Sequence, residues 1–180
     1  MTKYEIYNVY PQHPFNAGIA QCAEIRKIYP YFFPYNQSIT NWIPLQFTII
    51  KGNGFYDYQA NTHGIRLFSQ RLKDILYKYK SVNDRIQWLE VTIADKNKIR
   101  PYYILHFYKN ADVIEYELSG WDGKFFNTNM VFDKKKIQKY NIFSIPELGY
   151  EHSLIIKREI AIEIEEQKLS GINLQPAITN

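Results

Sequence analysis

The residues best suited to chemistry in this 180-residue chain are four histidines and a single cysteine. The histidines are His13, His63, His106 and His152, and no two of them have the i, i+4 spacing that holds a metal ion on one helix face. Cys22 stands alone, which excludes an intramolecular disulfide and a cysteine-based zinc site. An enzyme with a site near His63 or Cys22 stays open, because only the fold brings a thiol and its base together.

Paired carboxylates give a weaker indication of catalysis. Glu115 and Glu117 are two residues apart, so in a strand they would share one face and could act as acid and base. Such carboxylates are usually solvated. The chain has no glycine-rich phosphate loop and no G-x-S-x-G nucleophile turn. The sequence therefore predicts no cofactor and no metal, and it favours a protein that binds over one that catalyses.

Aromatic and basic residues are interleaved at 77–80 and 100–103, a pattern that can stack bases and neutralise phosphates. Against this, Tyr79 belongs to an apolar helix stripe, and Tyr102 and Tyr103 to an apolar strand. The formal net charge of +4 is also weak for binding a polyanion. A nucleic-acid-binding module is therefore a second alternative, with less support than protein binding.

Charge is distributed unevenly along the chain. Residues 61–110 hold 10 basic and 4 acidic groups, whereas residues 111–180 hold 8 basic and 11 acidic groups. The basic middle suits an acidic partner, although scattered lysines also fit an ordinary solvated surface. A protein that mimics nucleic acid would be acidic, and this chain is not.

Composition predicts a folded, soluble protein. Hydrophobic residues make up 46% of the chain and aromatic residues 17%, which is too apolar for a disordered segment. The N-terminal stretch lacks the apolar core of a signal peptide, and no apolar run approaches the roughly 20 residues that cross a bilayer. We expect no membrane association and a cytoplasmic location.

Two strand–helix–strand units are predicted, over about 65–94 and 154–178. In the first, Ser69 has the character of a helix N-cap, and apolar residues follow at the spacing of one helix face. In the second, the stretch 157–168 alternates like a strand but ends in good helix formers; we favour the helix, with Gly171 as its C-cap. Pro176 predicts that the closing strand lies on an edge.

Other elements are predicted from shorter patterns. A first strand is expected at the N-terminus, a helix over 17–29 with Ile19 and Cys22 on its apolar face, and a strand over 45–50. The apolar run 102–108 predicts a central strand, and it could form a hairpin with the alternating run 113–118.

Together these elements predict an α+β fold: a mixed sheet with two strand–helix–strand units and a central β-meander. We expect one domain over residues 1–180, with a variable N-terminal part at 1–63 and a core at 64–178.

Two stretches resemble a family of bacterial proteins that confer immunity to polymorphic toxins. Residues 67–76 (LFSQRLKDIL) are similar to its strand-to-helix pattern S-x-R-L-K-x-x-L, and residues 169–176 (LSGINLQP) to its ending L-x-G-I-x-L-x-P. Residues 113–119 (VIEYELS) resemble a further motif, with Glu115 where aspartate is commoner, and Ile142-Phe143 resembles the pair before the last unit. The resemblance implies neutralisation of a cognate toxin by direct binding. It assigns no catalytic chemistry and leaves the oligomeric state open.

Aromatic residues in two loops are the predicted contacts with such a partner, because tyrosine, tryptophan and phenylalanine are enriched at interface centres. The first loop follows a glycine turn and the second surrounds 119–123. The predicted residues are Phe55, Tyr56, Tyr58, Trp121, Asp122 and Phe125. Each could instead fold back onto the core. The positive net charge predicts a toxin whose binding face is neutral or acidic.

Overall fold

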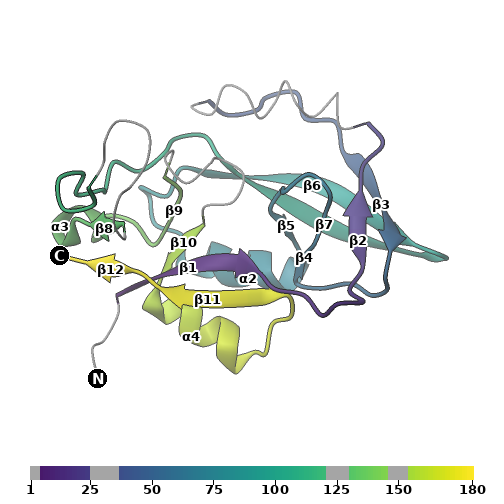
Figure 1. The fold of residues 1–180 in the computed structure, drawn as a ribbon. Coiled ribbons are helices and arrows are strands. Elements are labelled where there is room, and N and C mark those ends of the chain that lie inside the picture. Colours follow the sequence, from purple (N-terminus) through teal and green to yellow (C-terminus); the bar gives the residue numbers. More distant parts are fainter. Residues whose placement is uncertain (1–4, 25–36, 121–129, 146–153) are drawn as a thin grey trace.

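The computed structural model describes residues 5–24, 37–120, 130–145 and 154–180, which form a mixed α+β fold (Figure 1). Its largest sheet has six strands in the order β2-β3-β6-β7-β5-β4. These strands are β2 (Ile19–Gln21), β3 (Leu45–Lys51), β4 (Tyr58–Gln59), β5 (Leu67–Phe68), β6 (Ile86–Asp95) and β7 (Lys98–Phe107).

A second sheet has four strands in the order β11-β1-β10-β9, and a parallel pair joins β8 to β12. The strands are β1 (Ile6–Pro11), β8 (Val131–Phe132), β9 (Ile142–Phe143), β10 (Ile155–Lys157), β11 (Ile172–Pro176) and β12 (Ile178–Thr179). The described helices are α2 (Gln70–Tyr79), α3 (Lys134–Ile137) and α4 (Arg158–Glu166).

The two predicted strand–helix–strand units are present and are built alike. In the first, α2 connects β5 to β6, and both strands pair antiparallel with β7, which lies between them. In the second, α4 connects β10 to β11, and both pair antiparallel with β1. Each unit therefore contributes two parallel strands with a third, antiparallel strand between them. The strand β11 lies on an edge, as Pro176 predicts.

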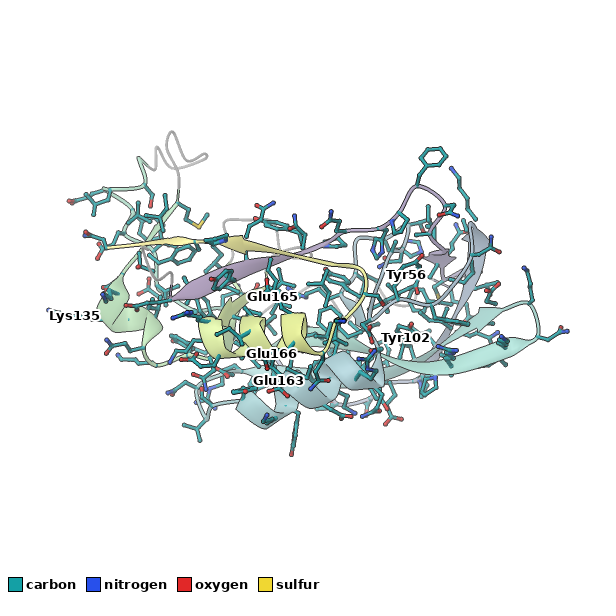
Figure 2. All side chains as sticks on the ribbon, turned by 90° about the horizontal axis from the view of Figure 1, so that it is seen from below. Tyr56, Tyr102, Lys135, Glu163, Glu165 and Glu166 are labelled. Atoms are coloured by element: carbon teal, nitrogen blue, oxygen red, sulfur yellow. The ribbon has the colours of Figure 1, made fainter. Side chains whose placement is uncertain are left out.

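The helices of the two units pack against each other, and Figure 2 shows α2 and α4 side by side. Their apolar stripes are buried: Leu72, Ile75 and Leu76 from α2, and Ile160, Ala161 and Ile164 from α4. They meet side chains of both sheets, among them Leu105 and Ile156, in one hydrophobic core. Burying a side chain such as Leu72 stabilises the fold by about 1.5–3 kcal/mol.

A second core lies on the other face of the six-stranded sheet. Strand alternation sends Leu89, Val91 and Ile93 of β6 to this face, where Phe47 and Tyr102 join them. The sheet is therefore apolar on both faces over its central strands, which explains why β7 has an almost continuous apolar run.

Three local predictions are wrong. The helix expected over 17–29 is not formed at its start, because Ile19–Gln21 is the strand β2, paired with β3. The expected hairpin of 102–108 with 113–118 is absent, because β7 pairs with β6 and β5, and residues 116–120 form a turn. Gly171 does not cap α4, which ends with Gln167 as its C-cap.

No helix in the described part of the chain is long and apolar enough to cross a membrane.

Candidate partner-binding surface

The first predicted contact loop presents Phe55 at the edge of the second core. Its ring stacks on Tyr102, with centroids 6.4 Å apart and an interplanar angle of 29°. The guanidinium of the exposed residue Arg100 lies 4.5 Å from the Phe55 centroid. Phe55 is half-buried, so one side of this Arg100–Phe55–Tyr102 stack faces solvent. An aromatic ring beneath an arginine is the type of group enriched at interface centres.

Tyr56 is held in place next to this stack. The Tyr102 hydroxyl donates a hydrogen bond to the Tyr56 carbonyl at 2.8 Å, and the Tyr56 amide donates to the Gln59 side chain at 3.0 Å. Figure 2 shows Tyr56 and Tyr102 in the same part of the molecule. The His13 ring packs edge-on against the Tyr56 ring at 5.4 Å. Burial lowers the pKa of His13 and raises the pKa of Tyr102, and each shift favours the uncharged form of the side chain.

Tyr58 is not exposed, contrary to expectation. It is the first residue of β4, only 2% of its surface is accessible, and its ring packs edge-on against Phe68 with centroids 4.7 Å apart. Burial raises the pKa of Tyr58 to about 12. A side chain in this position stabilises the core, and Phe55 and Tyr56 are the members of the loop that reach the surface.

Trp121, Asp122 and Phe125 lie outside the described residues. The chain that leads to them is fixed by Ser119, whose hydroxyl donates to the Glu115 carbonyl at 2.7 Å and accepts from the Val131 amide at 2.9 Å. Ser119 is fully buried. The four-residue spacing of Glu115 and Ser119 thus closes a turn. Since this segment is not a strand, Glu115 and Glu117 are not presented together on one strand face.

Asp57, which the sequence analysis did not single out, joins the two strand–helix–strand units. Its carboxylate accepts hydrogen bonds from the hydroxyl of Ser69 at 2.7 Å, and from the amide and hydroxyl of Ser170 at 2.8 and 2.9 Å. Arg71 lies 3.6 Å away and also donates to the Gln167 carbonyl at 2.9 Å. Ser69 caps α2, and Ser170 precedes β11. The two family-like motifs are therefore brought together by one buried carboxylate.

Cys22 and His63, the basis of the enzyme alternative, are neighbours in the structure. The Cys22 backbone amide donates to Nε2 of His63 at 3.3 Å, and the Thr62 hydroxyl lies 3.1 Å from the same nitrogen. Cys22 is buried, with 2% of its surface accessible. The ring nitrogen therefore accepts from the backbone in a structural contact. No group of three metal-ligating side chains occurs among the described residues.

Of the four tyrosines in the nucleic-acid alternative, Tyr77 is 65% exposed and the other three are buried or half-buried. Tyr102 and Tyr103 are buried, and the ring of Tyr103 is covered by Lys73, whose Nζ lies 3.5 Å from the centroid. The lysine cluster of α3 is partly paired, with Lys134 2.9 Å from Glu5 and Lys136 3.6 Å from Asp112. Figure 2 shows Lys135 of this cluster at the opposite end of the molecule from Tyr56 and Tyr102.

The chain also matches a known protein family. A family model described as immunity protein 43 matches residues 24–177, which is most of the chain. A search of curated proteins finds no match.

Proposed function

The chain belongs to the immunity protein 43 family, and from this premise we propose that it neutralises a cognate bacterial toxin by binding it directly in the cytoplasm. The family match over residues 24–177 is the observation that carries the proposal. The units β5-α2-β6 and β10-α4-β11 both lie within that match.

The proposed contact surface is centred on Phe55 and Tyr56, with Arg100 beside them. Tyr102 supports both aromatic residues, through the stack on Phe55 and the hydrogen bond to Tyr56. Preorganised aromatic and arginine side chains lose little conformational freedom on binding, which favours affinity. The segment that contains Trp121, Asp122 and Phe125 is proposed as a second contact.

We propose further that the chain acts as one domain. The N-terminal part supplies β1, which lies between β10 and β11, and β3, which pairs in parallel with β6. Residues 1–63 thus complete both sheets. The net charge of +4 supports a toxin whose binding face is neutral or acidic.

Co-expression in bacteria tests this function. The wild-type chain is expressed with the C-terminal module of the toxin encoded beside it, and growth is expected to be restored. Phe55→Ala with Tyr56→Ala should weaken protection, because it removes the proposed contacts and leaves the structural residues Asp57 and Tyr58 in place.

The variant Cys22→Ser separates binding from the enzyme alternative. It keeps the backbone amide that bonds His63 and removes only the thiol. Full protection is expected. If Cys22→Ser folds normally and fails to protect while complex formation persists, catalysis by the thiol replaces binding as the explanation.

A further inference from the structure

The segment between β1 and β2 carries one side chain that turns inward. All of the residues 11–16 except His13 are exposed, and Phe15 is fully exposed. Both ring nitrogens of His13 are buried, and neither has a hydrogen-bond partner in the described part of the chain. Hydrophobicity does not explain this arrangement, because the polar imidazole is enclosed while the phenyl ring beside it in the sequence lies in water. A buried polar group without a partner therefore needs another reason for its position.

The His13 ring fills the space between Tyr56 and the return from α4 to β11. On one side it packs edge-on against the Tyr56 ring, with centroids 5.4 Å apart. On the other side lies Gly171, where a Cβ would come within 2.8 Å of Cε1 and 3.1 Å of Nδ1 of His13. The imidazole thus joins three parts of the chain: the segment 12–18, the loop of Phe55 and Tyr56, and the second strand–helix–strand unit.

Hydrogen bonds hold this segment in place on both sides of the imidazole. Before it, the Gln12 amide donates to the Gly171 carbonyl at 2.9 Å. After it, the Gly18 amide donates to the Asn53 carbonyl at 2.8 Å. Asn53 lies in the turn that follows β3, so the segment bridges this turn and the return from α4.

The same segment holds both the ring and the backbone of Tyr56. The ring contacts His13. The Tyr56 amide donates to the Gln59 side chain at 3.0 Å, and the Gln59 side chain in turn donates to the Gly18 carbonyl. A displacement of the segment at His13 therefore changes the position of Tyr56 as a whole.

Protonation of His13 would place an uncompensated positive charge in this site. The segment 12–18 carries no charged residue, and the titratable residues of the two stretches packed against it are Tyr56, Asp57, Tyr58 and Lys168. The Asp57 carboxylate accepts from two serines and lies beside Arg71, and Lys168 is exposed. Neither charge forms an ion pair with the imidazole in the described structure, and burial is the cause of the lowered pKa of His13.

We propose that His13 is a pH-sensitive switch that controls the position of Tyr56. The neutral imidazole holds the Tyr56 ring in place. The imidazolium has two N–H donors and a charge without partners in this site, so it leaves and releases Tyr56 together with the segment 12–18. This inference goes beyond the proposed function, because it concerns the free chain and requires no partner.

The opening equilibrium should depend on pH with a definite sign and slope. In the open form His13 is solvated and has its ordinary pKa of about 6.5, whereas its pKa in the closed form is lower. The open form therefore binds the additional proton, and its population should rise as the pH falls below about 6.5. One proton per opening gives at most a tenfold rise per pH unit, and the rise ends at the lowered pKa.

Amide hydrogen exchange of the free wild-type chain, followed by NMR between pH 7.5 and about 5, measures this opening. The Gln12 and Tyr56 amides are the reporters, since both donate hydrogen bonds beside His13. After correction for the intrinsic exchange rate, their protection should fall by up to about tenfold per pH unit below pH 6.5. The amide of Leu76, on the buried face of α2, is the reference for global unfolding and should stay more strongly protected.

Two variants remove the proton site. His13→Phe keeps an aromatic ring between Tyr56 and Gly171, and His13→Leu is a smaller side chain that fits if the phenyl ring does not. In each, the protection of the Tyr56 amide should no longer vary with pH. The matched control is His63→Gln, which removes a histidine whose Nε2 accepts from the Cys22 amide at 3.3 Å and should leave the pH dependence at Tyr56 in place.

Three results would overturn the proposal. The first is a protection of the Tyr56 amide that does not change below pH 6.5 in the wild-type chain. The second is a pH dependence that persists undiminished in both His13 variants. The third is an equal free energy of opening for the Tyr56 and Leu76 amides, because exchange would then report global unfolding alone. None of these results involves the toxin, so the proposed function is tested independently by co-expression.

Discussion

Replacing Asp57 should destabilise the protein more than replacing any exposed carboxylate. The carboxylate is buried and accepts three hydrogen bonds at 2.7–2.9 Å, one from Ser69 and two from Ser170. A hydrogen bond to a charged group contributes about 1.5–3 kcal/mol, and bonds that share one acceptor are not additive. Some of this energy is offset by the desolvation of the carboxylate. We therefore expect Asp57→Ala to lower the free energy of unfolding by about 3 kcal/mol.

Urea unfolding measures this loss through the fluorescence of the three tryptophans. A loss of about 3 kcal/mol corresponds to a melting temperature lower by roughly 6–12 °C in a chain of this length. Asp57→Asn should be less destabilising than Asp57→Ala, because the amide oxygen can still accept from one of the two serines. The lost interactions join two units, so unfolding should also become less cooperative.

Asp112→Ala is the matched control for the Asp57 variants. The Asp112 side chain is 79% exposed and lies 3.6 Å from Lys136, so its removal should change stability by less than about 0.5 kcal/mol. A loss of similar size in Asp57→Ala and Asp112→Ala would refute the reasoning that Asp57 joins the two units.

Two further predictions concern glycine and pH. Gly171 has φ +79°, and a Cβ there would overlap the Tyr58 carbonyl, so Gly171→Ala should lower the free energy of unfolding in urea by about 2 kcal/mol or more. Gly54 has φ +91°, but a Cβ there would make only ordinary contact with the Tyr56 ring, so Gly54→Ala should lower it by about 1 kcal/mol. Burial lowers the pKa of His13 and His106 below the unfolded value of about 6.5, so the unfolded chain binds more protons and stability should fall as pH drops below that value. Scanning calorimetry between pH 7.5 and about 5 measures this loss of stability. His13→Phe should make stability depend less steeply on pH. A stability that rises on acidification over this range would contradict the lowered pKa of the two histidines.

The helices α2 and α4 could be predicted because their determinants are local. Ser69 accepts from the Leu72 amide at 3.3 Å as an N-cap, and the apolar stripe that follows it is buried, as its spacing indicates. The second helix, α4, is also formed, because Ile160 and Ile164 are buried on the same face. In both helices, a pattern within four to ten consecutive residues is sufficient to predict the helix.

Strand pairing is harder to predict from the sequence, because it depends on distant partners. Ile19 and Cys22 have helical spacing, yet pairing of Ala20 with Ile49 places this segment in the sheet. The hairpin of β6 and β7 turns at Lys96, whose φ is +52°. In the sequence, the alternating run 87–94 and the apolar run 102–108 are close enough to pair as a hairpin around Lys96 and Asn97. The run 113–118 is equally close to 102–108, so sequence proximity does not choose between the two hairpins.

The candidate surface was only partly accessible to sequence reasoning. Phe55 and Tyr56 could be named from their position after a glycine turn, but the same argument included Tyr58, which β4 turns into the core. The role of Asp57 could not be predicted from the sequence, because its partners Ser69 and Ser170 are 12 and 113 residues away. The exposure of Phe15 likewise follows from tertiary structure, because nothing in its neighbours distinguishes an exposed phenylalanine from a buried one.

Titration of the toxin's activity with this chain tests the central claim most directly. A fixed amount of the purified toxin module is mixed with increasing amounts of the wild-type chain, and residual activity is measured after short and long incubation. Neutralisation by binding predicts that activity falls linearly to zero at a fixed molar equivalence and does not change with time. A loss of activity that continues with time at a small fraction of one equivalent would contradict the account, because it requires the chain to act on the toxin catalytically.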